Sequence, residues 1–457
     1  MHTEVQQENK MGVMPVNRLL ISMSLPMMIS MLVQALYNVV DSIFVAQIHK
    51  DALTAVSLAF PLQSLMIAVC AGTGVGINAI LSRALGAGDR ERANRAAGNG
   101  VFLAVLSYIV FCILGFVAVK PFYASQTDDI MIAQYGRDYL SIVMILSFGF
   151  FMQMTFERLL QATGKTLYTM FTQGTGAIIN LILDPILIFG YCGLPRMEVR
   201  GAALATVIGQ MVAGLLAIVI KVRKNKEIHL SIRRFRPSGK IIAAIYKVGI
   251  PSIIMQAIGS LMTYGMNRIL IGLEMTGATV FGVYFKMQSF VFMPIFGMNN
   301  GVVPIIAYNY GAGKRTRMIR TIRYALVYAF AIMLMGLLIF QVFPEQLLRL
   351  FNADELMLAY GVPALRIISI HFPVAAICII LGTVFQALGH AFYSLIVSVA
   401  RQIVVLLPAA YLLSLTGRVT AVWWSFPIAE VASLTITLIC FVRIYRKVIC
   451  KVPDKEA

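Results

Sequence analysis

The chain has 457 residues, of which 59% are hydrophobic and 13% are charged, and its mean hydropathy is +0.82. A water-soluble domain of this size cannot bury so much apolar surface, so the composition excludes a soluble globular protein. The formal net charge of +18 does not indicate a nucleic-acid partner, because the basic residues lie in short segments between apolar runs.

Apolar runs of about 20 residues or more, the length of a helix that crosses roughly 30 Å of hydrocarbon, recur from Leu19 to Arg443. Gly, Pro or charge clusters bound each run, and twelve membrane-spanning helices are predicted. They are expected over residues 17–47, 53–83, 95–120, 131–160, 166–190, 201–222, 241–272, 277–310, 319–343, 356–388, 392–415 and 419–445. The segment before Asn17 lacks the features of a cleaved signal peptide, so the first span is expected to be retained.

The second half of the chain repeats the first at an offset of 225 residues. GAGDR at 86–90 corresponds to GAGKR at 311–315, and QATG at 161–164 corresponds to QALG at 386–389. Each copy holds six predicted spans, and an even number makes both copies enter the membrane in the same direction. We therefore predict an all-α polytopic membrane protein with two six-helix lobes, related by a pseudo-twofold axis along the membrane normal.

Three segments are expected: a first lobe over residues 1–222, a linker over 223–240 and a second lobe over 241–457. The linker is basic and polar, which predicts a short interfacial helix on anionic lipid headgroups; a lipid-regulatory role is the alternative. Lys and Arg gather in alternate loops, so the positive-inside rule places both termini in the cytoplasm.

No motif of an enzyme or a nucleotide-driven pump is present. The six Cys show no CxxC spacing, the five His are isolated from one another, and the glycine-rich segment at 311–314 lacks the spacing of a phosphate loop. The sequence therefore predicts no enzyme, no disulfide framework, no zinc site and no cofactor.

Two acids lie inside apolar helices of the first lobe, where a charged group is costly and needs a reason. Counted along their helices, Asp41 and Asp184 both lie roughly 27 to 36 Å from the cytoplasmic end and could share one pocket. Asn180 is four residues before Asp184, on the same helix face, and Pro185 frees a backbone carbonyl. These groups suit a proton, or serve as metal ligands if Na⁺ is the ion; two structural acids are the alternative.

Pro26 and Pro251 occupy equivalent positions in the first helix of each lobe. A functional bend is expected at Pro26, which shares its helix with Asp41, whereas Pro251 fits a static kink equally well. Glu157 lies about two turns from the cytoplasmic end of its helix. It is a candidate for an inner gate, paired with Arg158 or a loop base, or it reaches the interface as a snorkelling side chain.

The second copy has Val405 and Ala409 where the first has Asn180 and Asp184. Its interior offers bases instead, so we expect acids in one lobe and bases in the other. Lys286 is expected either to line a wet cavity or to form a buried ion pair, while Arg366 and Arg401 are interpreted as structural. The seam between the lobes is the expected substrate cavity. Its candidate lining residues are Gln34, Tyr37, Asn38, Lys286, Met287, Asn299 and Asn300.

The order and doubling of these features resemble the multidrug and toxic compound extrusion (MATE) family. The resemblance rests on Pro26 and Asp41, GAGDRER and GAGKRTR, FERLLQATGK after the fourth span, and NLILDP in the fifth. It is strongest to the DinF-type and MepA-type bacterial branch, because the acids that the NorM type carries in its second lobe are missing.

The resemblance implies a V-shaped pair of lobes in a bacterial inner membrane that exports organic, often cationic or amphipathic compounds in exchange for H⁺ or Na⁺. By resemblance, Asp41, Asn180 and Asp184 form the cation site and Pro26 bends as its occupancy changes. Partners are then small drug-like molecules and membrane lipids, and the protein is expected to work as a monomer. A flippase for lipids or lipid-linked oligosaccharides is the alternative; Lys286 and Arg401 favour it weakly, but the first-lobe acids would repel a pyrophosphate headgroup.

Overall fold

The computed structural model describes residues 9–231, 235–351 and 353–454, which fold almost entirely into helices. The helices are α1 Lys10–Val13, α2 Val16–Ile48, α3 Lys50–Gly86, α4 Arg90–Val117, α5 Val119–Gln126, α6 Ile130–Ile145, α7 Phe148–Ala162, α8 Thr166–Phe189, α9 Val199–Lys224, α10 Gly239–Leu273, α11 Met275–Ala312, α12 Arg315–Val342, α13 Pro344–Arg349, α14 Glu355–Ser369, α15 Phe372–Ala387, α16 Ala391–Val399, the π-helix η1 Ala400–Leu406, α17 Leu407–Ser414, α18 Val419–Val422, α19 Ser425–Lys447 and the short 3₁₀ helix η2 Ile449–Lys451.

Ten helices of the described chain are long and apolar enough to cross a membrane, and two bent pairs bring the number to twelve. The pair α6 and α7 bends by 46°, and the pair α14 and α15 bends by 47°. The second bend has a clear cause, because Pro373 at the start of α15 cannot continue the hydrogen bonds of α14. Both bends occur at matching places in the two repeats, as expected for a duplicated chain.

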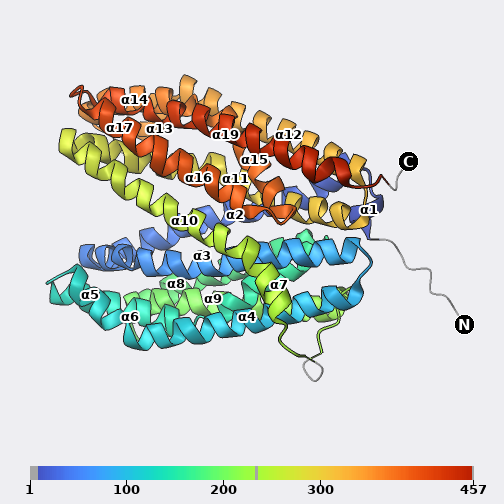
Figure 1. The fold of residues 1–457 in the computed structure, drawn as a ribbon. Helices are drawn as coiled ribbons and strands as arrows, with labels where there is room; N and C mark the ends of the chain where they lie inside the picture. The colour runs from blue at the N-terminus through green and yellow to red at the C-terminus, as the bar shows by residue number, and fades with distance from the viewer. Residues whose placement is uncertain (1–8, 232–234, 352, 455–457) are drawn as a thin grey trace, which may run out of the picture.

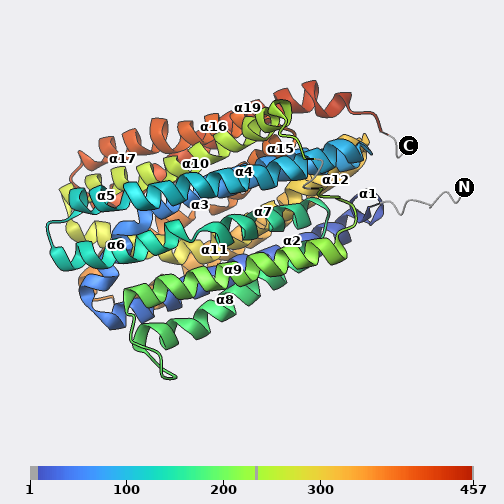
Figure 2. The ribbon, with the colours of Figure 1, turned by 90° about the horizontal axis from the view of Figure 1, so that it is seen from below.

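The helices form two lobes, the first from α2 to α9 and the second from α10 to α19. Figure 1 shows them as two layers, the first lobe in blue to green and the second in yellow to red. Seen from below, α2, α8 and α9 of the first lobe lie side by side (Figure 2). Each lobe has its own hydrophobic core. The predicted fold class, an all-α membrane protein of two six-helix lobes, is confirmed.

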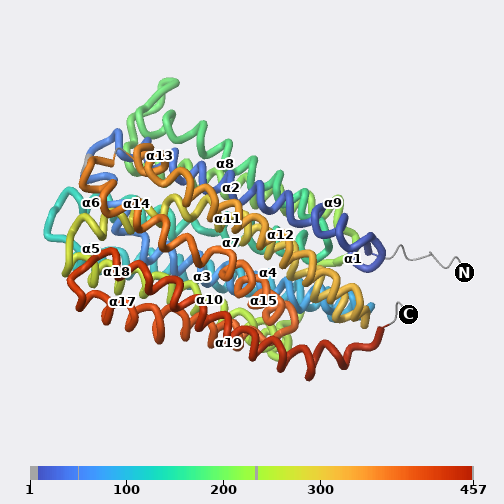
Figure 3. Tube along the Cα trace, turned by 90° about the horizontal axis from the view of Figure 1, so that it is seen from above, coloured from blue at the N-terminus to red at the C-terminus, as the bar shows by residue number. Residues whose placement is uncertain are grey.

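One end of the bundle carries both described termini and the clusters of basic residues, and we call it the basic end. The helices α13, α14, α17 and α18 lie at the opposite end, which we call the far end (Figure 3). The lobes are hydrogen-bonded to each other near the basic end: Asn309 Nδ2 donates to the Met11 carbonyl at 3.1 Å, and Arg317 Nη2 to the Met14 carbonyl at 2.6 Å. The segment around α1 thus clasps the second lobe.

The same N-terminal segment also holds the first lobe. Asn9 donates to the Thr163 carbonyl at 3.1 Å and to Glu227 Oε2 at 2.6 Å. Burial lowers the pKa of Lys10; the neighbouring charge of Lys165 lowers it further, and Glu227 opposes both. The segment from Asn9 to Met14 therefore bridges the two lobes at the basic end.

The repeated glycines explain how closely the lobes approach. A Cβ on Gly86 would lie 1.9 Å from the Tyr308 carbonyl oxygen, and a Cβ on Gly311 would lie 2.0 Å from the Arg83 carbonyl oxygen. Only glycine permits such backbone contact. Because Gly86 and Gly311 are repeat equivalents and pack reciprocally across the seam, the doubled motif is an inter-lobe contact.

The linker differs from the expectation. Its described residues 225–231 and 235–238 contain no helix, so the predicted interfacial helix is not found there, and residues 232–234 lie outside the described residues. The backbone N–H groups of His229 and Ser238 instead donate to Asn94 and Asn99 of α4, at 2.8 and 3.0 Å. In a helix these N–H groups would donate to backbone carbonyls. Here two asparagine side chains of α4 accept their hydrogen bonds instead, which holds the described parts of the linker against α4 without a helix.

Candidate functional site

The two membrane-embedded acids of the first lobe come together. Asp184 on α8 is fully buried and Asp41 on α2 is partly buried. Since α2 and α8 pack against each other, the two carboxyls lie within hydrogen-bonding reach. Two adjacent carboxylates in an apolar environment are strongly disfavoured as a double anion. The Asp41–Asp184 pair is therefore built to hold a proton or another cation.

Neighbouring polar groups orient the pair. In the amide orientation that satisfies both of its neighbours, Asn180 donates to Asp184 Oδ2 at 3.2 Å and accepts from the Thr206 backbone N–H at 3.1 Å. The Thr206 hydroxyl donates to the Ala202 carbonyl one turn earlier on α9, at 3.0 Å. The phenols of Tyr37 and Tyr139 lie beside the two acids. Four helices thus converge on one ionisable pair.

One oxygen of the pair is left for a ligand. Asp41 Oδ1 is buried and has no hydrogen-bond partner among the described residues. Buried polar atoms are almost always bonded to protein, water or an ion, so this oxygen marks where a proton, a water or a cation binds. If Na⁺ were the ion, Asp41 and Asp184 would be its charged ligands.

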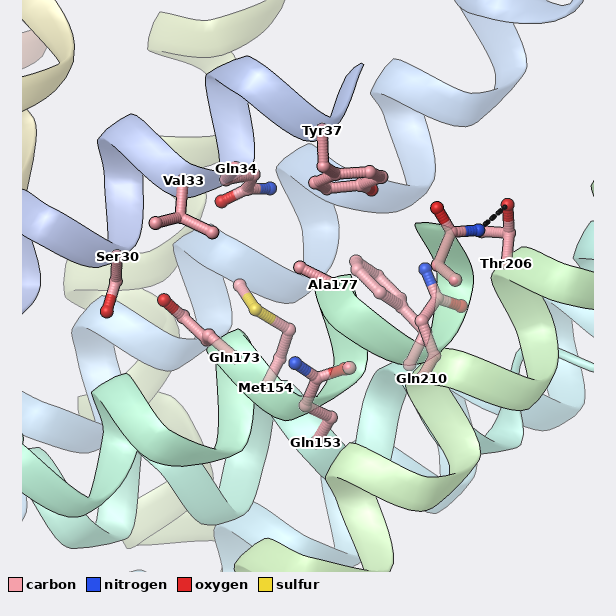
Figure 4. Close-up of a pocket in the computed structure, with 13 residues that line it drawn as sticks. Ser30, Val33, Gln34, Tyr37, Gln153, Met154, Gln173, Ala177, Thr206 and Gln210 are labelled. Atoms are coloured by element: carbon pink, nitrogen blue, oxygen red, sulfur yellow. Dashed lines mark hydrogen bonds between the residues drawn. The ribbon is translucent and has the colours of Figure 1, made fainter. Parts of the chain in front are cut away.

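A polar pocket of about 80 Å³ adjoins the pair inside the first lobe. In Figure 4, Gln34 and Tyr37 of α2 lie on one side of it, and Gln153 and Met154 of α7 lie on the other. The full lining is Ser30, Val33, Gln34, Tyr37, Phe150, Gln153, Met154, Gln173, Gly176, Ala177, Asn180, Thr206 and Gln210. A cavity of this volume holds several waters but is too small for a drug-sized molecule.

Glu157 lies behind two lining residues of this pocket, Gln153 and Gln173, to which it is hydrogen-bonded, and it is almost completely buried, with 1% of its surface exposed. Three side chains donate to its carboxylate: Gln153 at 3.1 Å, Thr172 at 2.8 Å and Gln173 at 2.8 Å. The expectation that Glu157 snorkels to the interface is wrong, because neutral donors within the lobe satisfy it. No ion pair between Glu157 and a base is found in the described part of the chain either.

The inter-lobe contact at this level is made by Arg158 instead. Its Nη1 donates to Gln161 Oε1 at 2.8 Å and to Asn300 Oδ1 of α11 at 2.7 Å. Arg158 is also buried, with 6% exposure, so this is a desolvated, charge-assisted hydrogen bond between the lobes. The role of Glu157 as an inner gate stays a prediction.

The proposed cavity residues fall into separate groups. Gln34 and Tyr37 line the first-lobe pocket, whereas Asn38 and Lys286 are exposed. Met287 is buried in the core of the second lobe. Asn299 is half-buried and lies next to Asn300, at the level of the Arg158 contact.

Lys286 faces the seam between the lobes. It precedes Gly297 by eleven residues, which is close to three full helical turns and places both on one face of α11. A Cβ on Gly297 would lie 2.6 Å from Met28 of α2, so this face looks toward the first lobe. Because Lys286 is exposed, its alternative as a buried ion pair is wrong.

The seam itself is wider toward the far end. Gly72 of α3 still touches Ile253 of α10, but seam-facing residues beyond that level are exposed, such as Leu65 at 43% and Tyr264 at 64%. The lobes therefore touch near the basic end and separate toward the far end.

The second lobe does contain a buried acid, which corrects the expected division of acids and bases. Glu430 on α19 is 3% exposed, and its Oε2 lies 3.4 Å from Arg401 Nη1 on η1. Arg401 is thus structural as expected, but its partner is a carboxylate. Arg366 is exposed, and Gln341 donates to its backbone carbonyl at 2.7 Å. Glu430 was missed because its neighbours in sequence resemble an ordinary helix start.

Pro26 lies inside α2 and is buried. It has no N–H to offer the Ser22 carbonyl, and the Thr166 hydroxyl of α8 approaches that carbonyl at 3.5 Å instead. The helix that carries Asp41 therefore has a weak point in its first third, at the eleventh of its 33 residues, and it is supported there by the helix that carries Asp184. The functional bend at Pro26 stays a prediction.

Known proteins resemble both lobes of the chain. The MatE family model matches residues 26–186 and 251–412, one block in each lobe. Multidrug export protein MepA of Staphylococcus haemolyticus is 28% identical over 413 residues, covering 89% of each chain. The FAD transporter of Shewanella oneidensis is 26% identical over 429 residues, covering 91% of this chain and 92% of its own.

A solved structure described as the outward-facing conformation of a multidrug resistance MATE family transporter matches with a TM-score of 0.91. It is 25% identical and covers 97% of this chain and 99% of its own.

Proposed function

The chain belongs to the MatE family of multidrug and toxic compound extrusion transporters, and we propose that it exports amphipathic organic compounds in exchange for a cation bound at Asp41 and Asp184. The observation that carries the proposal is the buried Asp41–Asp184 pair with its unpartnered Oδ1. An acid pair in the membrane is retained at a cost, which a coupling ion explains.

We propose that the basic end faces the cytoplasm, following the positive-inside rule. The structure then represents an outward-facing state, since the lobes touch near the basic end and separate toward the far end. Substrate would leave from the seam, and the first-lobe pair would load its cation from outside. One copy is sufficient for this cycle, because both walls of the seam come from one chain.

The ion acts through α2. Neutralising the Asp41–Asp184 pair removes the repulsion between α2 and α8, and α2 then changes its bend at Pro26. Because α2 also packs against α11 of the second lobe, a change in its bend alters the inter-lobe contact. The ion can drive the cycle only if it binds the two states unequally, which a pair assembled from two moving helices provides.

We propose H⁺ rather than Na⁺ as the coupling ion. Sodium needs several oxygen ligands around one point, but Asn180 turns its amide nitrogen toward Asp184 and its oxygen toward Thr206. The two carboxylates are then the charged ligands left for an ion, beside the phenols of Tyr37 and Tyr139. Two carboxyls with one free position suit a shared proton better than a metal ion.

The test is transport in proteoliposomes. Efflux of a fluorescent lipophilic cation is measured under a pH gradient and, separately, under a Na⁺ gradient. We expect wild type to respond to the pH gradient, and Asp184→Asn and Asp41→Asn to lose that response. Asp128→Asn is the matched control, since Asp128 is exposed. Efflux by both pair variants with normal gradient dependence would exclude the proposal.

A second substrate class has one observation in its favour. Lys286 is a cation exposed on the seam-facing side of α11, which suits an anionic group on the substrate, and a relative of similar length is named an FAD transporter. Export of a flavin dinucleotide by wild type, lost in Lys286→Gln while efflux of the lipophilic cation persists, would establish this class.

A further inference from the structure

We propose that Glu157 is a second proton-binding residue of the first lobe, connected to the Asp41–Asp184 pair by water in the pocket between them. The inference rests on the proposed function, because it assigns the route by which the coupling proton leaves the pair toward the basic end.

The pocket joins the two sites. Asn180 and Tyr37, which contact the pair, line it together with Gln153 and Gln173, which donate to Glu157. Along α8, Gln173, Ala177, Asn180 and Asp184 follow one another at spacings of three or four residues and so share a face. The eleven residues from Gln173 to Asp184 span about 16 Å, a distance that direct proton transfer cannot cover but a short water chain can.

Unpartnered polar atoms mark where that water binds. Asp41 Oδ1 and Gln173 Oε1 are both buried without a hydrogen-bond partner in the described structure. Gln173 lines the pocket, and Asp41 lies one helical turn beyond Tyr37, which also lines it. Each needs a water. With a volume of about 80 Å³, the pocket has room for several waters, and its lining offers hydroxyl and amide groups to hold them.

The surroundings of Glu157 suit a group that changes its charge. Its hydrogen-bond donors are the amides of Gln153 and Gln173 and the hydroxyl of Thr172, and amides and hydroxyls can turn to accept from a protonated carboxyl. A structural carboxylate buried this deeply would ordinarily be paired with a base. The hydrogen bonds of Arg158, on the same helix, go to Gln161 and Asn300 instead.

Five helices of the described chain pack against α7, and they bring few charged groups near Glu157. Helix α3 presents the Cys70 thiol, α8 presents the neutral Thr172 and Gln173, and α11 reaches Arg158 through Asn300. Helix α9 carries Lys221, which is buried and seven residues beyond Gly214, a neighbour of Gln153. On α4, Asn99 is buried and its oxygen accepts from Ser238. Arg158 and Lys221 both lie on the basic-end side of Glu157. Their positive charges stabilise the carboxylate that remains when Glu157 releases its proton.

The consequence is a link between the ion site and the inter-lobe contact. Glu157 is next in sequence to Arg158, and Arg158 holds Asn300 of the second lobe. A proton that moves from the pair to Glu157 changes the electrostatic environment of the residue that joins the lobes. Release to the cytoplasm is then coupled to separation at the basic end.

The experiment uses the full chain in proteoliposomes with an enclosed pH indicator, and it measures substrate-driven proton counterflow across a series of pH values. Substrate affinity is measured separately by titration of the purified protein. We expect Glu157→Gln to bind substrate normally, to slow proton counterflow by about tenfold or more and to flatten its pH dependence. Glu157→Asp should restore part of the rate, whereas Asp128→Asn should behave as wild type.

A second variant tests the water route without touching an acid. Ala177→Leu places a larger apolar side chain in the pocket and should reproduce the slow counterflow of Glu157→Gln, while Ala177→Ser keeps the pocket polar and should not. This pair also decides the question if Glu157→Gln fails to fold.

The outcomes separate the two proposals. If Asp184→Asn abolishes counterflow but Glu157→Gln and Ala177→Leu keep the wild-type rate and pH profile, the inference fails and the proposed function stands. A lower rate in Glu157→Gln with an unchanged pH profile means a structural role, which also overturns the inference. If Asp184→Asn itself retains normal counterflow, the proposed function fails.

Discussion

The hydrogen bond between Arg158 and Asn300 offers a direct test of how the lobes are held together. Asn300→Ala removes the 2.7 Å bond from Arg158 Nη1 to Oδ1. A hydrogen bond to a charged group contributes about 1.5–3 kcal/mol, but Nη1 keeps its 2.8 Å bond to Gln161 within the first lobe. The lower figure therefore applies, and about 1.5 kcal/mol corresponds to a roughly tenfold shift in the equilibrium between the two states.

The direction follows from the geometry. The bond exists only while the lobes touch at the basic end, so its loss should favour molecules that are open there. Spin labels on Arg90→Cys and Arg320→Cys, both exposed at the basic end, would report the distance between the lobes after the six free cysteines are replaced. We expect Asn300→Ala to raise the long-distance population relative to wild type.

The neighbouring Asn299 provides a matched control, because its Oδ1 has no hydrogen-bond partner in the described part of the chain. Asn299→Ala should leave the distance distribution unchanged. Equal distributions for Asn300→Ala and Asn299→Ala would refute the view that Arg158 and Asn300 stabilise the closed basic end.

Three other outcomes are expected. Gly311→Ala should favour opening at the basic end and lower the melting temperature, since its Cβ would lie 2.0 Å from the Arg83 carbonyl; Gly282→Ala, with nothing within 4 Å, should do neither. Removing either Arg401 or Glu430 alone should destabilise the fold by about 3–5 kcal/mol, and replacing both by Met much less, as thermal melting of the four proteins would show. Pro26→Ala gives Ser22 a regular helical partner and should slow efflux while substrate binding is retained; unchanged efflux would argue against a hinge in α2.

Much of the fold could be predicted because it rests on patterns that extend over whole helices. The length of each apolar run gives the spans, and the repeat of GAGDR as GAGKR gives two similar lobes. The sequence could not show why the repeated motif contains glycine. That reason is the close contact of Gly86 with Tyr308, which depends on how the two lobes dock. The linker was mispredicted for a related reason: Asn94 and Asn99 supply its hydrogen bonds, and these residues lie more than a hundred positions away.

The candidate site was predictable in its acids but not in their partners. A carboxyl in an apolar helix is conspicuous, so Asp41 and Asp184 could be named from the sequence alone. Thr206 and Tyr139 could not, because a hydroxyl is common in a membrane helix and gains its role only from the helix it faces. Glu430 shows the opposite failure: it lies well inside the predicted span 419–445, but its burial and its Arg401 partner are visible only in the structure.

The two lobes accommodate their buried acids differently, and under the proposed function this difference would confine ion coupling to the first lobe. In the second lobe, Arg401 of the same chain lies 3.4 Å from Glu430 Oε2 and compensates its charge. In the first lobe, Asp41 and Asp184 have only neutral neighbours on four helices, so compensation must come from an ion that enters and leaves. Giving the first lobe a base of its own, as the second lobe has, tests this explanation. A base placed at Asn180, as Asn180→Lys, would supply the first lobe with a permanent counter-ion, and we expect that variant to fold, to bind substrate and to lose its response to the pH gradient.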